Sequence, residues 1–516
     1  MLLTAAMLVY GRQQTLPDST ASLYRELVEV LCVAKKTRWP GSEALISADL
    51  KRQALERVFY AMQEAGGTAL QVSEAAKLLR DWQPSPLADD AAGRTLLDRL
   101  GNDTGLLRFE DQGNRRLRVV RPWHRSFQEY LAACQLAARE ESVDAVVDEL
   151  VKTGRAADPS WEGVLRFMVG VHGARGSARA RAWVSRLYHH AAEGSRRGRL
   201  LGLVGTALTE YREHFDGFTL RDAERREVDL AGEIADRFAE EGAGWPLLDR
   251  LLALEALGAL GDPRLELEDI WVDVPGGTFT MGADQDAYQA APPHEVEVPA
   301  FKVAWRPVTV QDYAAFVEGG YPAPPDWPRQ RFHPNRPVVR VSWHDAVAFC
   351  GWANDHWPVP EGWTIRLPSE AEREFLAAGE EGRRYPWGTK EEPGAGDQAR
   401  ANYDWGPGRP GELTPVGAFP LGDVEVGARR VVDLAGNVWE WCADHWRDKK
   451  DVDKWRQGGF LPFVMDESAV SDRVVRGGSW FLDSRHLRCS CRLGIRSGHR
   501  SGSVGFRVVC VPAPER

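Results

Sequence analysis

Apolar positions recur with a helical period through the first half of the chain. Residues at i, i+3, i+4 and i+7 are apolar in five stretches, and this spacing places them on one face of an amphipathic helix. Gly and Pro residues stand near the ends of these stretches, where helices begin and end. The pattern predicts helices over residues 21–36, 49–66, 142–154, 180–194 and 245–265, within a mainly helical region that reaches residue 262.

One β-like interruption divides this helical region. Residues 104–123 read TGLLRFEDQGNRRLRVVRPW, with two short alternating runs on either side of the turn Asp111-Gln112-Gly113-Asn114. This arrangement predicts a β-hairpin. Helices followed by a hairpin favour a winged helix over residues 48–135, in a first part that spans residues 1–135. Residues 136–262 are then expected to form an all-helical spacer.

The pattern changes in the second half, where short strands and Gly, Pro and Trp residues replace the long helical stretches. A helical period survives at residues 309–320 and 343–355, and residues 367–379 carry a capping signal, Ser369 followed by Glu372. Few helices with many short strands and long connections are typical of an α+β domain. We therefore expect a multidomain protein with an all-α N-terminal half and an α+β domain over residues 263–516.

Composition and charge narrow the classes of partner. The formal net charge is −10, so charge alone gives no reason to expect a nucleic-acid or membrane partner. The locally basic stretch RLRVVRPWHR could let a winged helix contact DNA, but we favour a solvated hairpin beside a packed helix. The apolar start MLLTAAMLVYGR lacks a basic n-region and a cleavage site and is too short to span a bilayer, so we predict a buried helix and a cytoplasmic protein.

Ten blocks in the second half carry a strong resemblance to a known family. They include VPGGTFTMGA (274–283), VSWHDAVAFCGWAN (341–354), IRLPSEAEREFLAAG (365–379), DLAGNVWEWCADHW (433–446), RVVRGGSW (473–480) and GFRVV (505–509). In this order they resemble the formylglycine-generating enzyme, or sulfatase-modifying factor, family. The resemblance covers about residues 268–512 and implies a C-type-lectin-like fold.

A second resemblance concerns the first half. VRPWHRSFQEYLAACQLA (120–137) looks like the segment that closes the winged-helix domain of NACHT-type nucleotide-binding proteins, and residues 2–32 resemble the helical stretch downstream of their ATPase core. The chain contains no G-x-x-x-x-G-K-[ST] motif, the loop that cradles a nucleotide phosphate in such proteins. We therefore expect no ATP hydrolysis by this chain and a partner ATPase or conflict-system protein that acts through its N-terminal half.

The resemblance implies catalytic chemistry that these residues do not support. Family members that oxidise a cysteine to formylglycine carry two active-site Cys shortly after the GGS[WY] block, as a thiolate pair that holds copper. Here residues 481–487 read FLDSRHL, and Cys489 and Cys491 come later. Relatives that form sulfoxides carry an iron-binding histidine triad. In the first half of this chain, by contrast, His189 and His190 are the one adjacent His pair. We predict a non-enzymatic protein; the alternative is an oxidase or related metalloenzyme of the formylglycine-generating type.

Calcium is the cofactor that the resemblance leaves open. Some family members hold it near blocks that match Asn402, Asn437 and Glu440 here, with oxygen ligands that suit a hard cation. Asn437 could equally cap a turn. We therefore expect either no cofactor or calcium at these three residues.

Residues 481–503 have no clean period of 2 or 3.6 and look like no packed element. They resemble the variable segment of retroelement-diversified proteins, whose lectin-like domain ends in RGGSW…GFRVV and whose asparagine codons are rewritten at adenines. Such AAC codons cannot become Trp, Met, Lys, Gln or Glu, and residues 481–503 contain none of these five. The resemblance implies that Arg485, Leu487, Arg488, Arg492 and Arg500 are fixed scaffold.

The remaining side chains of this segment are the predicted binding residues. We expect them to point outward and to bind a macromolecular ligand, much as antibody loops do. The alternative is an ordinary loop-rich end of a family member that is not diversified. The predicted ligand-binding residues are Phe481, Leu482, Asp483, Ser484, His486, Cys491, Leu493, Ile495, His499, Ser501 and Ser503.

Overall fold

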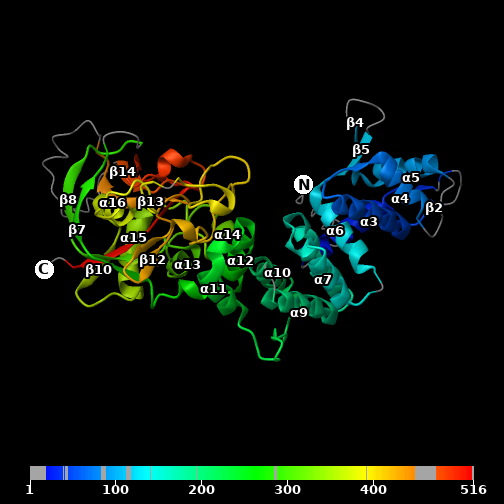
Figure 1. Cartoon of the computed structure of the whole chain (residues 1–516), viewed down its shortest axis with the longest axis horizontal. Helices are drawn as coiled ribbons and strands as arrows, with labels where there is room; N and C mark the ends of the chain where they lie inside the picture. The colour runs from blue at the N-terminus through cyan, green and yellow to red at the C-terminus, as the bar shows by residue number, and fades with distance from the viewer. Residues whose placement is uncertain are drawn as a thin grey trace. The chain divides into compact units, whose positions relative to one another are not determined.

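The chain folds into two compact units, residues 1–230 and 231–516 (Figure 1). The computed structural model describes residues 19–35, 37–38, 40, 45–82, 89–111, 118–139, 141–193, 196–283, 288–390, 392–447 and 472–513. The helix predicted in the first twelve residues lies outside the described residues. The predicted division at residues 135 and 262 stays a prediction, because the two compact units describe the chain at a coarser level.

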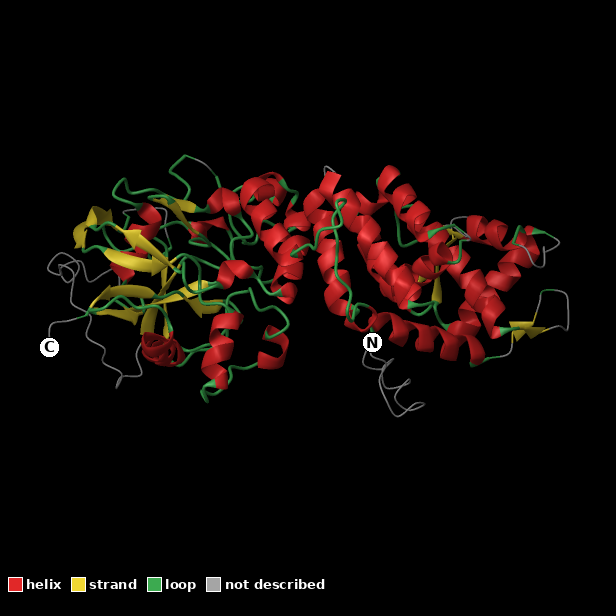
Figure 2. Ribbon diagram, turned by 90° about the horizontal axis from the view of Figure 1, so that it is seen from below, coloured by secondary structure: helices red, strands yellow, loops and turns green. Residues whose placement is uncertain are grey.

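The N-terminal unit is mainly helical, as Figure 2 shows. All of the helical stretches predicted here are helices, because each presents one apolar face to its neighbours. The α-helices are α2 (Thr20–Val33), α3 (Ala48–Glu64), α4 (Val72–Arg80), α5 (Asp90–Thr104), α6 (Arg125–Ala137), α7 (Val143–Lys152), α8 (Glu162–Gly173), α9 (Ser177–Glu193) and α10 (Arg197–Glu210). Short strands β1 (Thr37–Arg38) and β2 (Leu45–Ile46) and short 3-10 helices η1 (Arg155–Ala157), η2 (Pro159–Trp161) and η3 (Arg212–His214) connect them.

The predicted hairpin is confirmed. Strands β4 (Leu107–Asp111) and β5 (Arg118–Pro122) pair antiparallel, with Phe109 opposite Val120. Strand β3 (Leu70–Gln71) joins the other side of β5 and completes a three-stranded sheet in the order β3-β5-β4. The turn residues 112–117 lie outside the described part of the chain.

The C-terminal unit combines few helices with small sheets and long loops, as the pattern predicts. Helices α11 (Leu230–Glu241) and α12 (Leu247–Leu260) precede the strands. The three predicted helices are α13 (Val310–Glu318), α15 (Trp343–His356) and α16 (Glu370–Ala378), and α14 (Trp327–Gln330) is a fourth, short helix. The capping box predicted from Ser369 and Glu372 is present at the start of α16.

Four sheets hold the loops of this unit together. One has the order β10-β17-β9-β6, a second β15-β14-β13-β16, and two are the hairpins β7-β8 and β11-β12. Their strands are β6 (Trp271–Val274), β7 (Gly277–Met281), β8 (His294–Val298), β9 (Phe301–Ala304), β10 (Trp363–Arg366), β11 (Val424–Val426), β12 (Arg429–Val431), β13 (Trp439–His445), β14 (Asp472–Arg476), β15 (Arg492–Arg496), β16 (Val504–Phe506) and β17 (Val509–Pro512). Short 3-10 helices are η4 (Gly242–Gly244), η5 (Pro263–Leu265), η6 (Gly396–Gln398), η7 (Pro420–Gly422) and η8 (Ser484–Leu487).

The two faces of strand β13 pack differently, one against apolar side chains and the other against charged side chains. Trp439 and Trp441 lie two residues apart and both enter the main apolar core, since alternate strand residues face the same side. Glu440 points the other way and is fully buried between Arg373 and Arg507. Burial alone would raise the pKa of Glu440, but the two guanidinium groups outweigh it and hold the pKa below its ordinary value.

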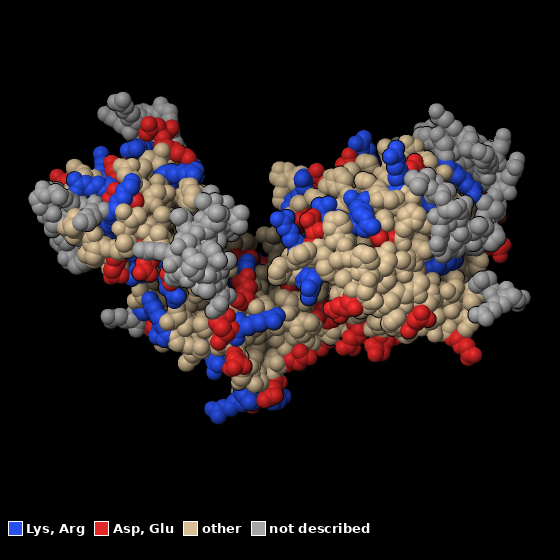
Figure 3. Space-filling model, turned by 180° about the vertical axis from the view of Figure 1, so that it is seen from behind, with Lys and Arg blue, Asp and Glu red and all other residues tan. Residues whose placement is uncertain are grey.

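Charged side chains cover both units without a single dominant sign. On the face drawn in Figure 3, acidic and basic side chains are interspersed over the N-terminal unit, and the C-terminal unit shows a broad uncharged area with acidic side chains along its lower edge. Within the described residues, no helix has both the length and the apolar character that crossing a membrane requires.

Candidate binding surface

The predicted variable segment leaves one sheet and returns to it. After β14 the chain passes through Gly477, Gly478 and η8, then pairs back as β15 antiparallel to β14 and ends in β16 beside β13. The expectation of no packed element was therefore wrong, because residues 492–496 form a strand. Their sequence, RLGIR, places Leu493 and Ile495 two residues apart, with Gly494 between them against Trp446, where a Cβ would lie 2.4 Å from the indole ring.

Two glycines place the first loop of the segment. Gly477 and Gly478 both have positive φ, 96° and 77°, which side chains other than glycine rarely adopt. A Cβ on Gly478 would also lie 2.7 Å from the backbone oxygen of His486. The glycine pair therefore lets the loop of residues 481–486 fold back onto the turn that starts it.

Buried arginines anchor the segment to helix α16. Arg492 is fully buried, and its Nη2 lies 3.1 Å from Glu370 Oε2. Arg476 on the adjacent strand donates to Glu370 Oε1 at 2.7 Å and reaches Glu374 Oε2 at 2.6 Å. Burial alone would raise the pKa of Glu370, yet Arg492 and Arg476 overcome it and lower the pKa. The ion pairs therefore fix where β15 and the loop before it lie.

Apolar side chains of the segment also point inward. Leu487 belongs to a small core with Tyr385 and Tyr403, and Cys489 packs against Ala377 and Ala378. Cys491 is fully buried in the main core. The expectation that Cys491 and Ser503 point outward is corrected: both are buried, Cys491 at the start of the β15 crossing and Ser503 just before β16.

Leu493 and Ile495 require a second correction. Both were expected to form an exposed apolar surface with Phe481, but they are only half-exposed and pack against the main core. They lie on β15, which sits at the end of its sheet. Phe481 itself is 45% exposed, as expected.

The loop of residues 481–486 presents side chains of mixed chemistry. Phe481 contacts Trp480 with ring centroids 5.6 Å apart. Asp483 caps η8, and its hydrogen bonds to Arg485 lower its pKa to about 2, so it is an anion at neutral pH. Ser484 and His486 are half-exposed beside them, whereas Leu482 is half-exposed and, like Leu493 and Ile495, packs against the main core. An aromatic ring, an anion, a hydroxyl and an imidazole thus stand on one short loop.

Tyr288 extends this loop and was missed from the sequence. Its ring lies 5.1 Å from the His486 ring and is 46% exposed, and its backbone oxygen accepts a hydrogen bond from the Arg492 amide at 3.2 Å. Tyr288 is about 200 residues away along the chain, so no local sequence signal connects it to this loop.

The loop of residues 498–501 continues the same surface. Trp480 Nε1 donates to the backbone oxygen of Gly502 at 3.3 Å, which ties the two loops together. Arg500 pairs with Asp345, and Ser501 shares a 2.9 Å hydroxyl contact with Ser503. His499 is exposed at the tip. We name the two loops with Tyr288 the display surface: residues 481–486, residues 498–501 and Tyr288.

The expected scaffold residues play unequal parts. Leu487 and Arg492 are buried and hold the backbone. Arg485, by contrast, is 75% exposed and pairs only with Asp483 among the ion pairs of this region. Arg500 is exposed as well, although its pairing with Asp345 fixes the second loop. Arg485 is therefore placed to contact a ligand as readily as the residues predicted to do so.

The thiols of Cys442, Cys489 and Cys491 are buried. Burial raises the pKa of Cys489 and of Cys491 to about 12 each, so both stay protonated at neutral pH. Cys442 is also fully buried, with its pKa raised well above the ordinary value by burial. A protonated, buried thiol is a poor nucleophile and a poor copper ligand.

The three residues predicted for calcium do not fit such a site in this arrangement. The Glu440 carboxylate faces the two buried guanidinium groups of Arg373 and Arg507. Asn402 Nδ2 donates to Asn437 Oδ1 at 3.3 Å, and that oxygen also accepts from the Thr414 amide. In the described part of the chain, no group of three or more His, Cys, Asp and Glu side chains is placed to hold a metal ion. Calcium at these residues stays a prediction that this geometry does not favour.

Comparisons with known proteins agree with this fold. The family model of the sulfatase-modifying factor enzyme 1-like domain matches residues 261–511. A formylglycine-generating enzyme of Thermomonospora curvata is 31% identical over 309 residues, which cover 48% of this chain and 97% of that enzyme. A hercynine oxygenase of Mycolicibacterium smegmatis is 31% identical over 297 residues, and the chain spans only 61% of its length.

Relatives of other kinds are also similar to part of this chain. An inactive C-alpha-formylglycine-generating enzyme 2 of Mus musculus is 29% identical over 317 residues, covering 49% of this chain and 90% of that protein. The solved structure of Treponema denticola variable protein 1 is 24% identical, covers 47% of this chain and 95% of that one, and has a TM-score of 0.35. The family thus includes named enzymes and a protein named as inactive.

The N-terminal unit lies outside the match to the family model, which begins at residue 261. Over the matched region, the high coverage of the Thermomonospora curvata enzyme at 31% identity leaves little of the domain unmatched. Through residues 261–511, the chain belongs to the sulfatase-modifying factor enzyme 1-like family.

Proposed function

We propose that the C-terminal unit is a non-catalytic binding domain that recognises a macromolecular ligand through the display surface. The observation that carries this proposal is the division of labour within residues 481–503. Arg492, Leu487 and Cys489 are buried and hold the backbone, whereas Phe481, Arg485 and His499 are exposed between them. A rigid backbone with changeable outward side chains is what a recognition surface needs.

The same division supports diversification by a retroelement. Residues that face outward can be exchanged at little cost in stability, whereas changes to buried residues destabilise a fold. The absence of Trp, Met, Lys, Gln and Glu from residues 481–503 fits substitution at adenines. Cys491 and Ser503 leave the proposed ligand-contacting set because they are buried, and Tyr288 and Arg485 enter it because they are exposed.

Deep sequencing of the end of this gene across a natural population of cells tests the proposal. We expect substitutions to concentrate at codons 481–486 and 499–501, at adenines of a template copy, and to be rare at codons 487 and 492. A uniform sequence across cells would overturn diversification. Substitutions spread equally over buried and exposed codons would overturn the assignment of the display surface.

Oxidase activity is the second candidate, because relatives that match this region are named formylglycine-generating enzyme and hercynine oxygenase. The buried, protonated state of Cys489 and Cys491 argues against thiolate catalysis. Oxygen consumption by the full chain, incubated with copper(I) and a cysteine-containing peptide, separates the two candidates. Turnover that is lost in a Cys489→Ala, Cys491→Ala double variant would replace the binding proposal.

We also propose that residues 48–135 form a winged helix derived from a NACHT-type protein, which supports the display domain and contacts a partner ATPase. The order α3, β3, α4, α5, β4, β5 supports this proposal, with the hairpin as the wing. We propose no DNA contact: the half-exposed Arg121 of the hairpin pairs with Glu110, and Arg118 lies near Asp111. Copurification of an ATPase with the full chain, but not with residues 231–516, is the expected result.

A further inference from the structure

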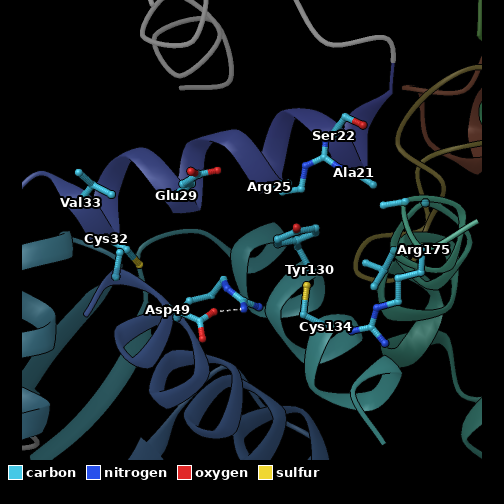
Figure 4. Close-up of a pocket in the computed structure, with 15 residues that line it drawn as sticks. Ala21, Ser22, Arg25, Glu29, Cys32, Val33, Asp49, Tyr130, Cys134 and Arg175 are labelled. Atoms are coloured by element: carbon cyan, nitrogen blue, oxygen red, sulfur yellow. Dashed lines mark hydrogen bonds and ion pairs between the residues drawn. The ribbon is translucent and has the colours of Figure 1, made fainter. Parts of the chain in front are cut away.

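A cavity of about 470 Å³ lies within the N-terminal unit. Its walls come from helices α2, α3, α6 and α8 and from the turn after α8. This volume is in the range of small-molecule sites. Figure 4 shows Tyr130 and Cys134 of α6 beneath helix α2, with Arg175 beside them.

Contacts at both ends of the cavity fix the position of helix α2 relative to α3 and α6. Tyr24 on α2 donates to Ser126 of α6 and packs edge-on against Phe127. Towards the other end of α2, the buried Lys51 ammonium group of α3 donates to the backbone oxygen of Cys32 at 3.0 Å. Helix α2 is therefore fastened to its neighbours at two points, and the space between these points is preformed rather than induced.

Gly170 sets the depth of the cavity on the α8 side. A Cβ on Gly170 would lie 2.4 Å from the Cβ of Ala21 and 2.6 Å from the Tyr211 ring. The missing side chain lets α8 approach α2 closely at this point. It leaves an apolar inner wall formed by Ala21, Gly170 and the Tyr130 ring.

The charged groups of the lining favour an anion. Three guanidinium groups, Arg25, Arg52 and Arg175, face two carboxylates, Glu29 and Asp49. Arg52 already bonds both Asp49 and Glu56. Arg25 is exposed, with its Nε 3.7 Å from Glu26, and the exposed Arg175 donates to the backbone carbonyl of Ala137. Both guanidinium groups are therefore accessible to an anion that enters the cavity.

The thiols and the phenol of the lining are neutral groups. Burial raises the pKa of Cys32 to about 11 and that of Cys134 to about 12. Burial also raises the pKa of Tyr130 above its ordinary value. No thiolate is available at neutral pH, so these groups serve as an apolar and weakly polar floor rather than as metal ligands or nucleophiles.

We propose that this cavity binds a small organic anion, a carboxylate or a phosphate ester with an apolar body. The anionic group lies between Arg25 of α2 and Arg175 after α8, and the apolar body lies against Tyr130 and Gly170. A bound anion bridges α2 to the helices beneath it. It therefore stabilises the N-terminal unit against unfolding, and the gain grows with the logarithm of its concentration above Kd, since it binds the folded state.

The first test uses the full chain and the fluorescent probe 1-anilinonaphthalene-8-sulfonate, which joins a sulfonate to an apolar ring system. We expect saturable binding at one site that Arg175→Ala and Arg25→Ala each weaken about tenfold, because each removes one charge-assisted contact. Arg94→Ala is the matched control, since Arg94 is exposed on α5 and does not line the cavity. Probe binding that neither Arg175→Ala nor Arg25→Ala weakens would overturn the proposal.

A second pair of variants tests the position of the apolar body. Ala174 is exposed and lines the cavity, whereas Ala178 is exposed on α9 and does not. We expect Ala174→Phe to abolish probe binding and Ala178→Phe to leave it unchanged, with the circular dichroism spectrum of both unchanged. If Ala174→Phe fails to fold, Arg175→Glu takes its place, and probe binding that survives in the folded variant contradicts the proposal.

Control probes separate this cavity from other apolar surfaces and define the anion. Phe481→Ala removes an exposed ring of the display surface, and we expect it to leave probe affinity unchanged. N-phenyl-1-naphthylamine, which lacks the sulfonate, should bind at least tenfold more weakly; equal affinity would overturn the anionic part of the proposal. Displacement by octanoate or by octyl phosphate identifies the head group, and displacement by neither would overturn the proposal.

Discussion

The elements of the two units are held together by different kinds of contact. The N-terminal unit packs amphipathic helices against one another, and its ion pairs lie mostly at partly exposed positions such as Arg155 with Glu64. The C-terminal unit has short elements and holds them with fully buried ion pairs, such as Arg507 with Glu440 and Arg492 with Glu370. The partners in these pairs are 67 and 122 residues apart along the chain.

This difference teaches where each unit is vulnerable. Exposed ion pairs contribute little to stability because water screens them. A buried pair, in contrast, becomes a large liability when one partner is removed, because the other charge is left without water or a counter-charge. Removing one partner of a buried ion pair in the C-terminal unit should therefore cost much more unfolding free energy than removing one partner of an exposed pair in the N-terminal unit.

The largest effect is expected from Glu440→Ala. This substitution leaves Arg373 and Arg507 buried without their shared carboxylate, at a cost of about 3–5 kcal/mol of unfolding free energy. Calorimetry of the full chain should show a lower transition for the C-terminal unit and an unchanged transition for the N-terminal unit. Glu425→Ala, which removes an exposed carboxylate near Arg430, is the control; equal effects of the two variants would break the comparison.

Among the described residues of the N-terminal unit, Glu56 is a buried carboxylate that departs from this pattern. Burial raises the pKa of Glu56 to about 7, although Arg52 acts in the opposite direction. The folded state therefore keeps a proton that the unfolded chain loses near pH 4.5, so the unfolding free energy falls as pH rises to about 7 and is constant above it.

The loss between these two pH values is about 3 kcal/mol at most, since each pKa unit corresponds to about 1.4 kcal/mol. Glu56→Gln should remove this dependence and raise stability at pH 8, as measured by urea unfolding at a series of pH values. The exposed Glu110→Gln serves as the control. A parent protein whose N-terminal transition does not change between pH 5 and pH 8 would contradict the raised pKa of Glu56.

Within the C-terminal unit, the anchors and the display surface should respond differently. Arg492→Met removes the guanidinium that pairs with Glu370, while Arg476 remains, so we expect a loss of about 2–3 kcal/mol. Phe481→Ala should change the unfolding free energy by no more than about 0.5 kcal/mol, because its ring is 45% exposed. Denaturant midpoints measure both, and a larger loss for Phe481→Ala would mean that the loop is core rather than display surface.

Removal of a helix N-cap is expected to have the same small effect in both units. Ser369 caps α16 by accepting from the Glu372 amide at 3.1 Å, and Ser47 caps α3 by accepting from the Leu50 amide at 3.1 Å. Replacing either serine by alanine should cost about 1 kcal/mol in its own unit. Thermal unfolding measures both losses. A loss of several kcal/mol in the C-terminal unit alone would show that local capping there depends on the buried ion pairs.

The sequence alone determined the local structure of both units. Helix positions followed from apolar periodicity, and the hairpin β4-β5 and the cap at Ser369 followed from short-range patterns. The shared orientation of Trp439 and Trp441 towards the core follows from the two-residue period of a strand. These features depend on residues that are close together along the chain, so the local sequence pattern is enough to predict them.

The tertiary structure decided which residues of the display surface face outward. Cys491 and Ser503 are buried, and Leu493 and Ile495 are half-buried, because β15 returns to a sheet whose partner strand was not apparent within the segment. Tyr288 reaches His486 across about 200 residues. Burial and contact between distant segments depend on how the whole chain packs, which is why the local pattern determined the elements and only the folded unit determined the surface.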